Sequence, residues 1–157
     1  MSNTLTRKQL GDFSSIVCFK AVIVGMEEAL GEKATAISLI AAGRARGKKL
    51  AEELGLTKGN TTLEDAANKL SQALGKDGTR LCLIDKIVQE GDVVKAYTSE
   101  TVCSAGEPQG SARKCTFTLG AVWGALEVIL GKRLQGTHAE SVLRGGTHDV
   151  FEFRDLK

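Results

Sequence analysis

The sequence lacks the patterns that mark most enzyme active sites. It contains only two histidines, no G-x-G-x-x-G pattern after a predicted strand, no P-loop and no recognisable nucleophile elbow. A reductase needs a hydride donor, and the glycine-rich pattern after a strand is the usual signature of dinucleotide binding. The sequence therefore predicts no catalytic residues, and it argues against an enzyme that uses nicotinamide or flavin.

Strong net charge and long apolar segments are also absent. The 21 lysines and arginines nearly balance 19 acidic residues, whereas nucleic-acid-binding domains usually carry a strongly basic face. The one dense basic run, residues 44–49, is followed by two glutamates, which indicates a solvated helix face. The most apolar window, residues 16–26, is too short to cross a bilayer, and residues 1–11 lack the apolar core of a signal peptide. We therefore expect a cytoplasmic protein that neither binds nucleic acid nor spans a membrane.

No two cysteines have the C-x-x-C spacing; the four are Cys18, Cys82, Cys103 and Cys115. Free cysteine is among the most buried residue types, so buried thiols are the main interpretation. A labile disulfide or thiol pair between Cys103 and Cys115 is the alternative, because these two residues flank a predicted loop.

A metal site is a further hypothesis. Cys103, Cys115, His138 and His148 are accepted types of zinc ligand, but their spacings match no zinc motif. A two-residue turn at residues 145–146 would also place the two histidines on opposite faces of a hairpin. We therefore expect hydrogen-bonded or surface histidines, and no metal site.

The length of 157 residues, with 42% hydrophobic and 25% charged residues, is typical of one globular domain. We predict a single domain over residues 1–157, with a helical half (1–76) and a strand-rich half (77–157). The first predicted helix spans residues 13–30, with Asp12 as N-cap and Gly31 at its end. From residue 16 to 26 this helix is apolar on nearly every side, with Lys20 as the only charge. A helix of that kind must be buried all round, so we expect a homodimer to cover part of it.

The second predicted helix, residues 33–54, contains Gly43 and Gly47 on one face. Each glycine costs a helix up to about 1 kcal/mol relative to alanine. Either the close approach of another backbone offsets that cost, or the helix kinks there. The apolar surface of this stretch is also expected to be covered in the homodimer.

A capping box at Thr61–Glu64 opens the third predicted helix. Its apolar residues recur with the helical period of 3.6 and end at Gly75; they are Leu63, Ala66, Ala67, Leu70 and Leu74.

The second half alternates strands with one helix. Runs rich in β-branched residues form two predicted hairpins, which turn at residues 90–92 and 145–146. Residues 104–113 hold the only proline and are predicted to form a mobile loop. The predicted strands are residues 80–89, 93–102, 134–143 and 149–153, and the predicted helix is residues 115–130.

The segment from residue 115 to residue 132 has a characteristic spacing of glycines. Its glycines stand at positions 120, 124 and 131, and a glycine-centred hairpin follows, ending Phe-Glu-Phe at residues 151–153. This pattern resembles the 4-vinyl-reductase (hydrocarbon-binding) domain family, over the last quarter to third of the chain. That family shares its fold with haem-NO-binding domains and with the small subunits of the TRAPP vesicle-tethering complex. The resemblance implies an α/β (α+β) fold in which three to four helices pack on an antiparallel sheet of about four strands.

One departure from the family's pattern concerns metal or thiol chemistry. The family commonly has two cysteines in the closing hairpin, where this chain has none; the corresponding positions fall near His138, Ser141, Gly145, Asp149 and Phe151. A site built from those cysteines is therefore not implied here. Cys103 and Cys115 do stand where the family often has cysteines.

The helix at residues 115–130 is the predicted ligand site. Its large apolar residues share one broad face, and Gly120 and Gly124 remove bulk beside Trp123, which can shape an apolar pocket. A plain packed core helix is the alternative interpretation. The predicted ligand-contacting residues are Leu119, Gly120, Val122, Trp123, Gly124, Leu126, Phe151 and Phe153.

The leading functional prediction is non-catalytic binding of a hydrophobic small molecule. The resemblance implies a tetrapyrrole, its precursor or a lipid-like molecule as that ligand, with a carrier or sensor role linked to pigment or photosystem biogenesis. A scaffold or assembly factor of the same fold, acting through protein partners, is the second hypothesis. A tetrapyrrole vinyl-reductase-like enzyme is the third.

Overall fold

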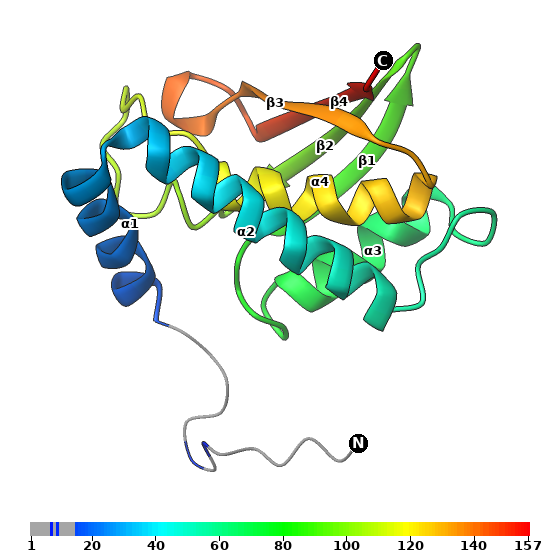
Figure 1. Cartoon of the computed structure of the whole chain (residues 1–157), viewed down its shortest axis with the longest axis horizontal. Coiled ribbons are helices and arrows are strands. Elements are labelled where there is room, and N and C mark those ends of the chain that lie inside the picture. The colour runs from blue at the N-terminus through cyan, green and yellow to red at the C-terminus, as the bar shows by residue number, and fades with distance from the viewer. Residues whose placement is uncertain (1–6, 8, 10–14) are drawn as a thin grey trace.

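The computed structural model describes residues 7, 9 and 15–157 (Figure 1). In this part of the chain, four α-helices and four strands confirm the predicted α+β class, with helices packed on an antiparallel sheet. The elements are α1 (Ile16–Leu30), α2 (Glu32–Glu53), α3 (Leu63–Leu74), β1 (Leu83–Glu90), β2 (Val93–Ser99), α4 (Thr116–Leu130), β3 (Leu134–Glu140) and β4 (Asp149–Asp155). None of the helices in the described ranges is long and apolar enough to cross a membrane.

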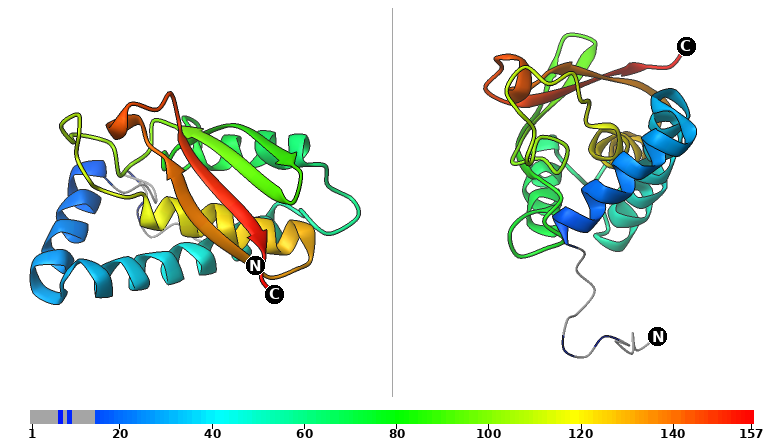
Figure 2. Two further views of the ribbon diagram at one scale, coloured as in Figure 1. Left: turned by 90° about the horizontal axis from the view of Figure 1, so that it is seen from above. Right: turned by 90° about the vertical axis from the view of Figure 1, so that its left-hand side faces the viewer.

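The sheet has the strand order β1-β2-β4-β3, and every pairing is antiparallel. Figure 2 shows the sheet as one layer, with α3 and α4 beneath it and α2 alongside α4. On the central strands β2 and β4, every second residue faces these helices. Ala96 and its pairing partner Phe151, for example, are fully buried. The core therefore lies between the sheet and the two helices α3 and α4.

The connection between β3 and β4 differs from the predicted two-residue turn. It contains a 3-10 helix, Val142–Arg144, which ends at Gly145 with φ of 88°. Ser141 supports this helix, because its side chain accepts a hydrogen bond from Leu143 N and its carbonyl accepts one from Gly146 N. The prediction of a turn at residues 145–146 alone was wrong because this local hydrogen bonding has no periodic signature in the sequence.

The helix starts agree with the predictions to within a few residues. The predicted cap Asp12 and the first predicted helical residue, Phe13, lie outside the described residues, and α1 begins after Ser15. For α3, the N-cap is Thr62, one residue later than the predicted capping box, because its side chain accepts a hydrogen bond from Asp65 N at 3.1 Å.

Helices α2 and α4 cross at four glycines. A Cβ atom on Gly47 would lie 1.9 Å from the carbonyl oxygen of Ala121, and one on Gly124 would lie 2.1 Å from that of Arg44. Gly43 and Gly120 face each other in the same way. The close-approach interpretation of Gly43 and Gly47 is therefore confirmed. The backbone that approaches them is α4 of the same chain. Coverage of the remaining apolar surface of α2 by a homodimer stays a prediction.

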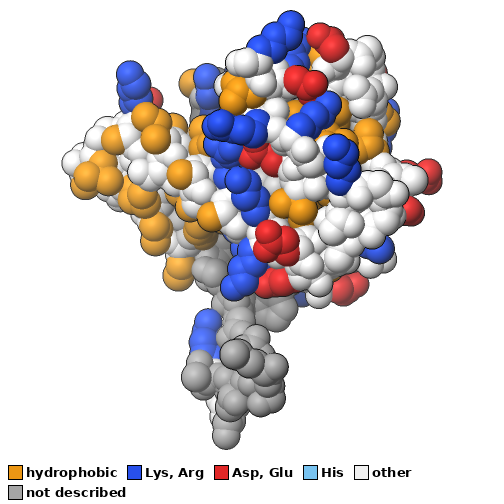
Figure 3. All heavy atoms as spheres, turned by 45° about the vertical axis from the view of Figure 1, so that its right-hand side comes forward, with side chains coloured by type: hydrophobic (Ala, Val, Ile, Leu, Met, Phe, Trp, Pro, Cys, Tyr) orange, Lys and Arg blue, Asp and Glu red, His pale blue; other side chains and the backbone are white. Residues whose placement is uncertain are grey.

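Helix α1 is largely uncovered in the single chain. Its only buried residue is Ile23. Figure 3 shows hydrophobic side chains gathered on the projecting part that carries α1. The large exposed apolar residues of α1 and the adjoining turn of α2 are Ile16, Val17, Val22, Val24, Leu30 and Ile37. The homodimer that the sequence suggests for α1 stays a prediction.

Candidate functional site

The eight predicted ligand-contacting residues lie in or beside the core, between α2 and the sheet. Trp123 is held there by contacts of its own, because its Nε1 donates a hydrogen bond to Leu134 O at 3.0 Å and the Arg44 guanidinium lies 4.6 Å from its ring centroid. Gly120 and Gly124 face the backbone of α2, so the room that they make is filled by that helix. Contact between a ligand and these eight residues stays a prediction.

A pocket of about 520 Å³ lies at the amino end of α4. It is lined by α1, the first half of α2, the loop from residue 102 to 114, and the first turn of α4. Its apolar wall comprises Phe19, Ile23, Ala36, Leu39, Val102 and Phe117. A second pocket of about 560 Å³ lies between the end of α3 and the start of β1; its lining is Gly75, Lys76, Arg80, Cys82, Leu83 and Glu100. None of the eight predicted residues lines either pocket.

The sequence analysis did not predict the pocket beneath α1, although the helical periodicity of α1 indicates one wall of it. Phe19, Ile23 and Glu27 recur every four residues and therefore share one helix face, which is the face that lines the pocket. The ring of Phe19 meets that of Phe117 edge-on, with 5.4 Å between centroids. Helical periodicity could have identified this face of α1. It could not have identified the first turn of α4, which packs against that face.

Ion pairs connect α1 to the loop along one side of this pocket. Lys20 Nζ lies 2.5 Å from Glu107 Oε1, and Arg113 bonds both to Glu107 and, at 2.7 Å, to Glu27. The hydrogen bond from Lys20, opposed by partial burial and supported by Arg113 and Ser111, lowers the pKa of Glu107 to about 2. These contacts tie residues 107–113 to α1; the mobility predicted for this loop stays a prediction.

Replacing Glu107 with glutamine should therefore destabilise the protein in a pH-dependent way. Because the pKa of Glu107 is about 2 in the folded state and near 4.5 when unpaired, its contribution is fully present above pH 4.5 and is lost as the pH falls towards 2. Urea unfolding of E107Q and wild type should show a difference at pH 6 that shrinks steadily below pH 4.5.

The control for this experiment is Glu53→Gln, which removes an exposed ion pair to Arg46 with 3.5 Å between charges. Exposed pairs contribute about 0–1 kcal/mol, so E53Q should unfold like wild type at every pH. A stability difference for E107Q that stays constant from pH 6 to pH 3 would show that Glu107 acts through packing and not through its charge.

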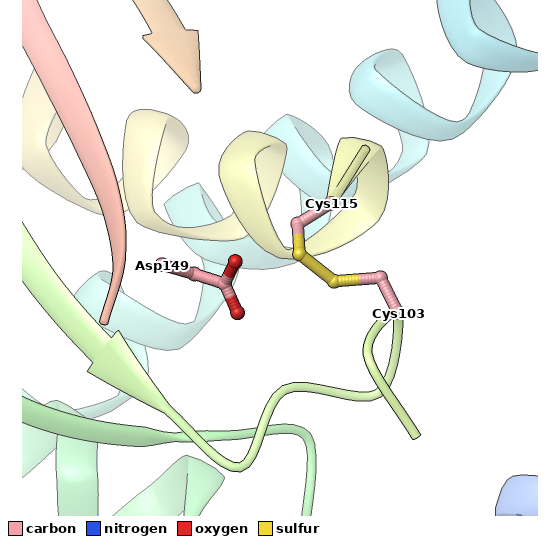
Figure 4. A group of neighbouring side chains, drawn as sticks. All are labelled: Cys103, Cys115 and Asp149. Atoms are coloured by element: carbon pink, nitrogen blue, oxygen red, sulfur yellow. A yellow bond between two sulfur atoms is a disulfide. The ribbon is translucent and has the colours of Figure 1, made fainter. Parts of the chain in front are cut away.

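Two of the four cysteines, Cys103 and Cys115, form a disulfide. The bond joins the loop to the N-cap residue of α4, and Figure 4 shows the Asp149 carboxylate pointing towards it. Cys82 is a buried free thiol whose pKa is raised to about 12, chiefly by burial, and Cys18 is exposed. The interpretation of all four as buried thiols thus holds only for Cys82, and the alternative pairing of Cys103 with Cys115 is confirmed.

Asp149 is the centre of a buried hydrogen-bond network. Its carboxylate accepts bonds from Thr101 Oγ1 at 2.8 Å and from Val142 N at 3.4 Å, and it lies 3.1 Å from His138 Nε2. The other ring nitrogen, Nδ1, accepts from Cys115 N, so Nε2 carries the hydrogen that is donated to Asp149. Burial raises the pKa of Asp149, but the bonds from His138 and Thr101 outweigh burial, and the net shift is downward.

The hypothetical metal ligands are only partly brought together. The ligand atoms of Cys103, Cys115 and Asp149 lie within 4.8 Å of one another, and His138 contacts Asp149. His148 lies elsewhere, with Nε2 3.0 Å from Asp85. The two sulfurs are bonded to each other, whereas zinc binds thiolates. Asp149, which the metal hypothesis did not include, holds the position between the disulfide and His138.

Comparison with known proteins supports the fold. No protein-family model and no curated protein matches the chain. Among solved structures, the phenol-responsive sensory domain of the transcription activator PoxR, solved with phenol, superposes with a TM-score of 0.65 at 14% identity, over 90% of this chain and 75% of that one. A trafficking protein particle complex subunit 3 from Naegleria fowleri, covalently bound to palmitic acid, gives 0.62 at 15% identity, over 90% and 93%. At these identities the likeness shows the fold that the sequence predicted, which both structures share.

Proposed function

We propose that the chain is a non-catalytic binding domain for a hydrophobic small molecule, held in the pocket between α1, α2 and the first turn of α4. The observation that carries this proposal is the pocket itself, with a volume of about 520 Å³ and an apolar wall drawn from three helices and a loop. Small-molecule sites typically measure about 300–1,000 Å³. The rest of the lining is polar or charged and includes Glu32, Lys33, Thr35 and Thr118, so the ligand would carry polar groups beside its apolar part.

Two properties of the compared structures support this proposal. The PoxR domain holds phenol and the trafficking subunit holds palmitic acid, so in both the same fold accommodates an apolar group. A tetrapyrrole ligand and a role in pigment or photosystem biogenesis depend only on the family resemblance, and neither compared structure supports them. A scaffold role is the second candidate, because the exposed apolar residues of α1 would suit a protein partner or a second copy.

Filling the pocket should abolish binding without unfolding the protein. Ala36 lines the pocket and is half-buried, so the larger ring of phenylalanine would occupy space that the ligand needs. In a fluorescence titration with the neutral apolar probe N-phenyl-1-naphthylamine, A36F should bind at least about tenfold more weakly than wild type, with a similar melting temperature.

Ala41→Phe is the matched control, because Ala41 is an exposed position on the same helix and does not line the pocket. A41F should bind the probe like wild type. Equal binding by wild type, A36F and A41F would place the probe outside this pocket and contradict the proposal. A wild-type protein that binds no apolar probe but selectively retains one protein partner would favour the scaffold.

A further inference from the structure

We propose that the molecule bound in this pocket ends in a carboxylate, which is held by the hydroxyl of Thr35 and by the first backbone N–H groups of α4. This inference depends on the proposed function and adds the chemical class of the ligand: an apolar body with an acidic head group. Three independent features of the pocket support it.

The first feature is the hydroxyl of Thr35. This residue lines the pocket in the first turns of α2, is 1% exposed, and its Oγ1 has no hydrogen-bond partner. Buried polar groups in folded proteins almost always have a partner. A hydroxyl left without a partner at the wall of a cavity therefore indicates a polar group on whatever fills that cavity.

The second feature is the amino end of α4, which lines the same pocket through Thr116, Phe117 and Thr118. The N-cap residue, Cys115, makes no side-chain cap, and the first turn contains no acidic residue. The first N–H groups of a helix have no partner within the helix, and the helix dipole favours an anion beside them. Both Thr35 and this helix end can thus donate hydrogen bonds to an acceptor.

The third feature is the state of the charged groups around the pocket. The carboxylates of Glu27 and Glu107 already accept hydrogen bonds from Arg113 and Lys20, so they do not call for a cationic ligand. Glu32, Lys33 and Lys114 also line the pocket and are exposed at its rim, where solvent and salt screen their charges. A ligand that brings acceptors fits the donors that remain. A carboxylate fits better than a phosphate dianion, because Arg113 is committed to the two glutamates.

The experiment compares an acid with its neutral ester. Purified full-length protein is titrated with the fluorescent polyene fatty acid cis-parinaric acid and, separately, with its methyl ester. Wild type should bind the acid more tightly than the ester. Thr35→Val, which keeps the shape and removes the hydroxyl, should bind the acid about tenfold more weakly than wild type and the ester unchanged.

Two further variants complete the comparison. Thr35→Ser keeps the hydroxyl and should bind the acid like wild type. Thr137→Val makes the same change at an exposed position on β3 and should leave both titrations unchanged. T35V should fold at least as stably as wild type, because it removes a buried hydroxyl without a partner.

The outcomes separate this inference from the function on which it depends. If wild type and T35V bind acid and ester with equal affinity, the carboxylate site is wrong and apolar binding in the pocket survives. If wild type binds neither probe, the proposed function fails, and the head-group inference fails with it. Loss of ester binding in T35V would show that Thr35 acts through packing, which would also overturn the carboxylate site.

Discussion

Replacing Gly124 with leucine should destabilise the protein strongly or prevent it from folding. A Cβ at this position would lie 2.1 Å from the carbonyl oxygen of Arg44 and 2.9 Å from its Cα, so α2 and α4 must move apart. Overpacking a core costs about 1–3 kcal/mol and sometimes more, and each kcal/mol lowers the melting temperature of a domain this size by about 2–4 °C. Thermal unfolding should therefore show a decrease on the order of 10 °C, or no cooperative transition.

Gly25→Ala is the control for this substitution. Gly25 is also a helix glycine, but a Cβ there would meet nothing within 4 Å. Alanine at an open helical position stabilises by about 0.5–1 kcal/mol relative to glycine, so G25A should melt at the same or a higher temperature. An unchanged melting temperature for Gly124→Leu, with loss of ligand binding, would instead support a cavity beside Trp123.

Replacing Asp149 with alanine should also destabilise the protein strongly. Asp149 is 1% exposed and accepts hydrogen bonds from Thr101, His138 and Val142. Without the carboxylate, these three donors lose their acceptor in the interior, and each buried group without a partner costs about 1–3 kcal/mol. Breaking a buried charged network of this kind typically costs about 3–5 kcal/mol, which urea unfolding at pH 7 would measure.

The chain contains a natural control for Asp149 in Asp85. Asp85 also contacts a histidine and a hydroxyl: its Oδ2 lies 3.0 Å from His148 Nε2 and accepts a hydrogen bond from Ser99 at 2.9 Å. Its side chain, however, is 42% exposed. Because water can replace these contacts, Asp85→Ala should cost less than about 1 kcal/mol. Equal losses for the two variants would contradict the role assigned to burial of the Asp149 network.

The local elements of the fold could be predicted from the sequence. The helix ends at Gly31 and Gly75 and the hairpin turn at Gly91 lie where the pattern places them, because capping and turn chemistry act between residues a few positions apart. The errors were also local. Thr62 and not Thr61 caps α3, and the 3-10 helix before Gly145 was missed, because neighbouring polar residues compete for the same backbone donors.

The pocket beneath α1 was not predicted from the sequence. The sequence analysis selected Trp123 and its neighbours, because a run of small and large apolar residues can line a pocket. In the fold these residues belong to the hydrophobic core. The pocket beneath α1 combines Phe19 and Thr35 with Phe117, and no spacing along the chain relates them. Asp149 stood out only as a position in a family pattern, although its burial makes it the central acceptor of the network.

Sequence alone was sufficient for the class of fold and the order of helices and strands. It also marked Gly43 and Gly47 as the site of either a close neighbour or a kink. It could not decide between the two or identify the neighbour. The crossing of Gly43 and Gly47 with Gly120 and Gly124, the pairing of β2 with β4, and the meeting of α1 with the start of α4 appear only in the folded chain. The physical reason is range: caps, turns and helical periodicity act over a few residues, whereas packing joins residues some 50 to 100 positions apart, as in the bond from Lys20 to Glu107, which spans 87 positions.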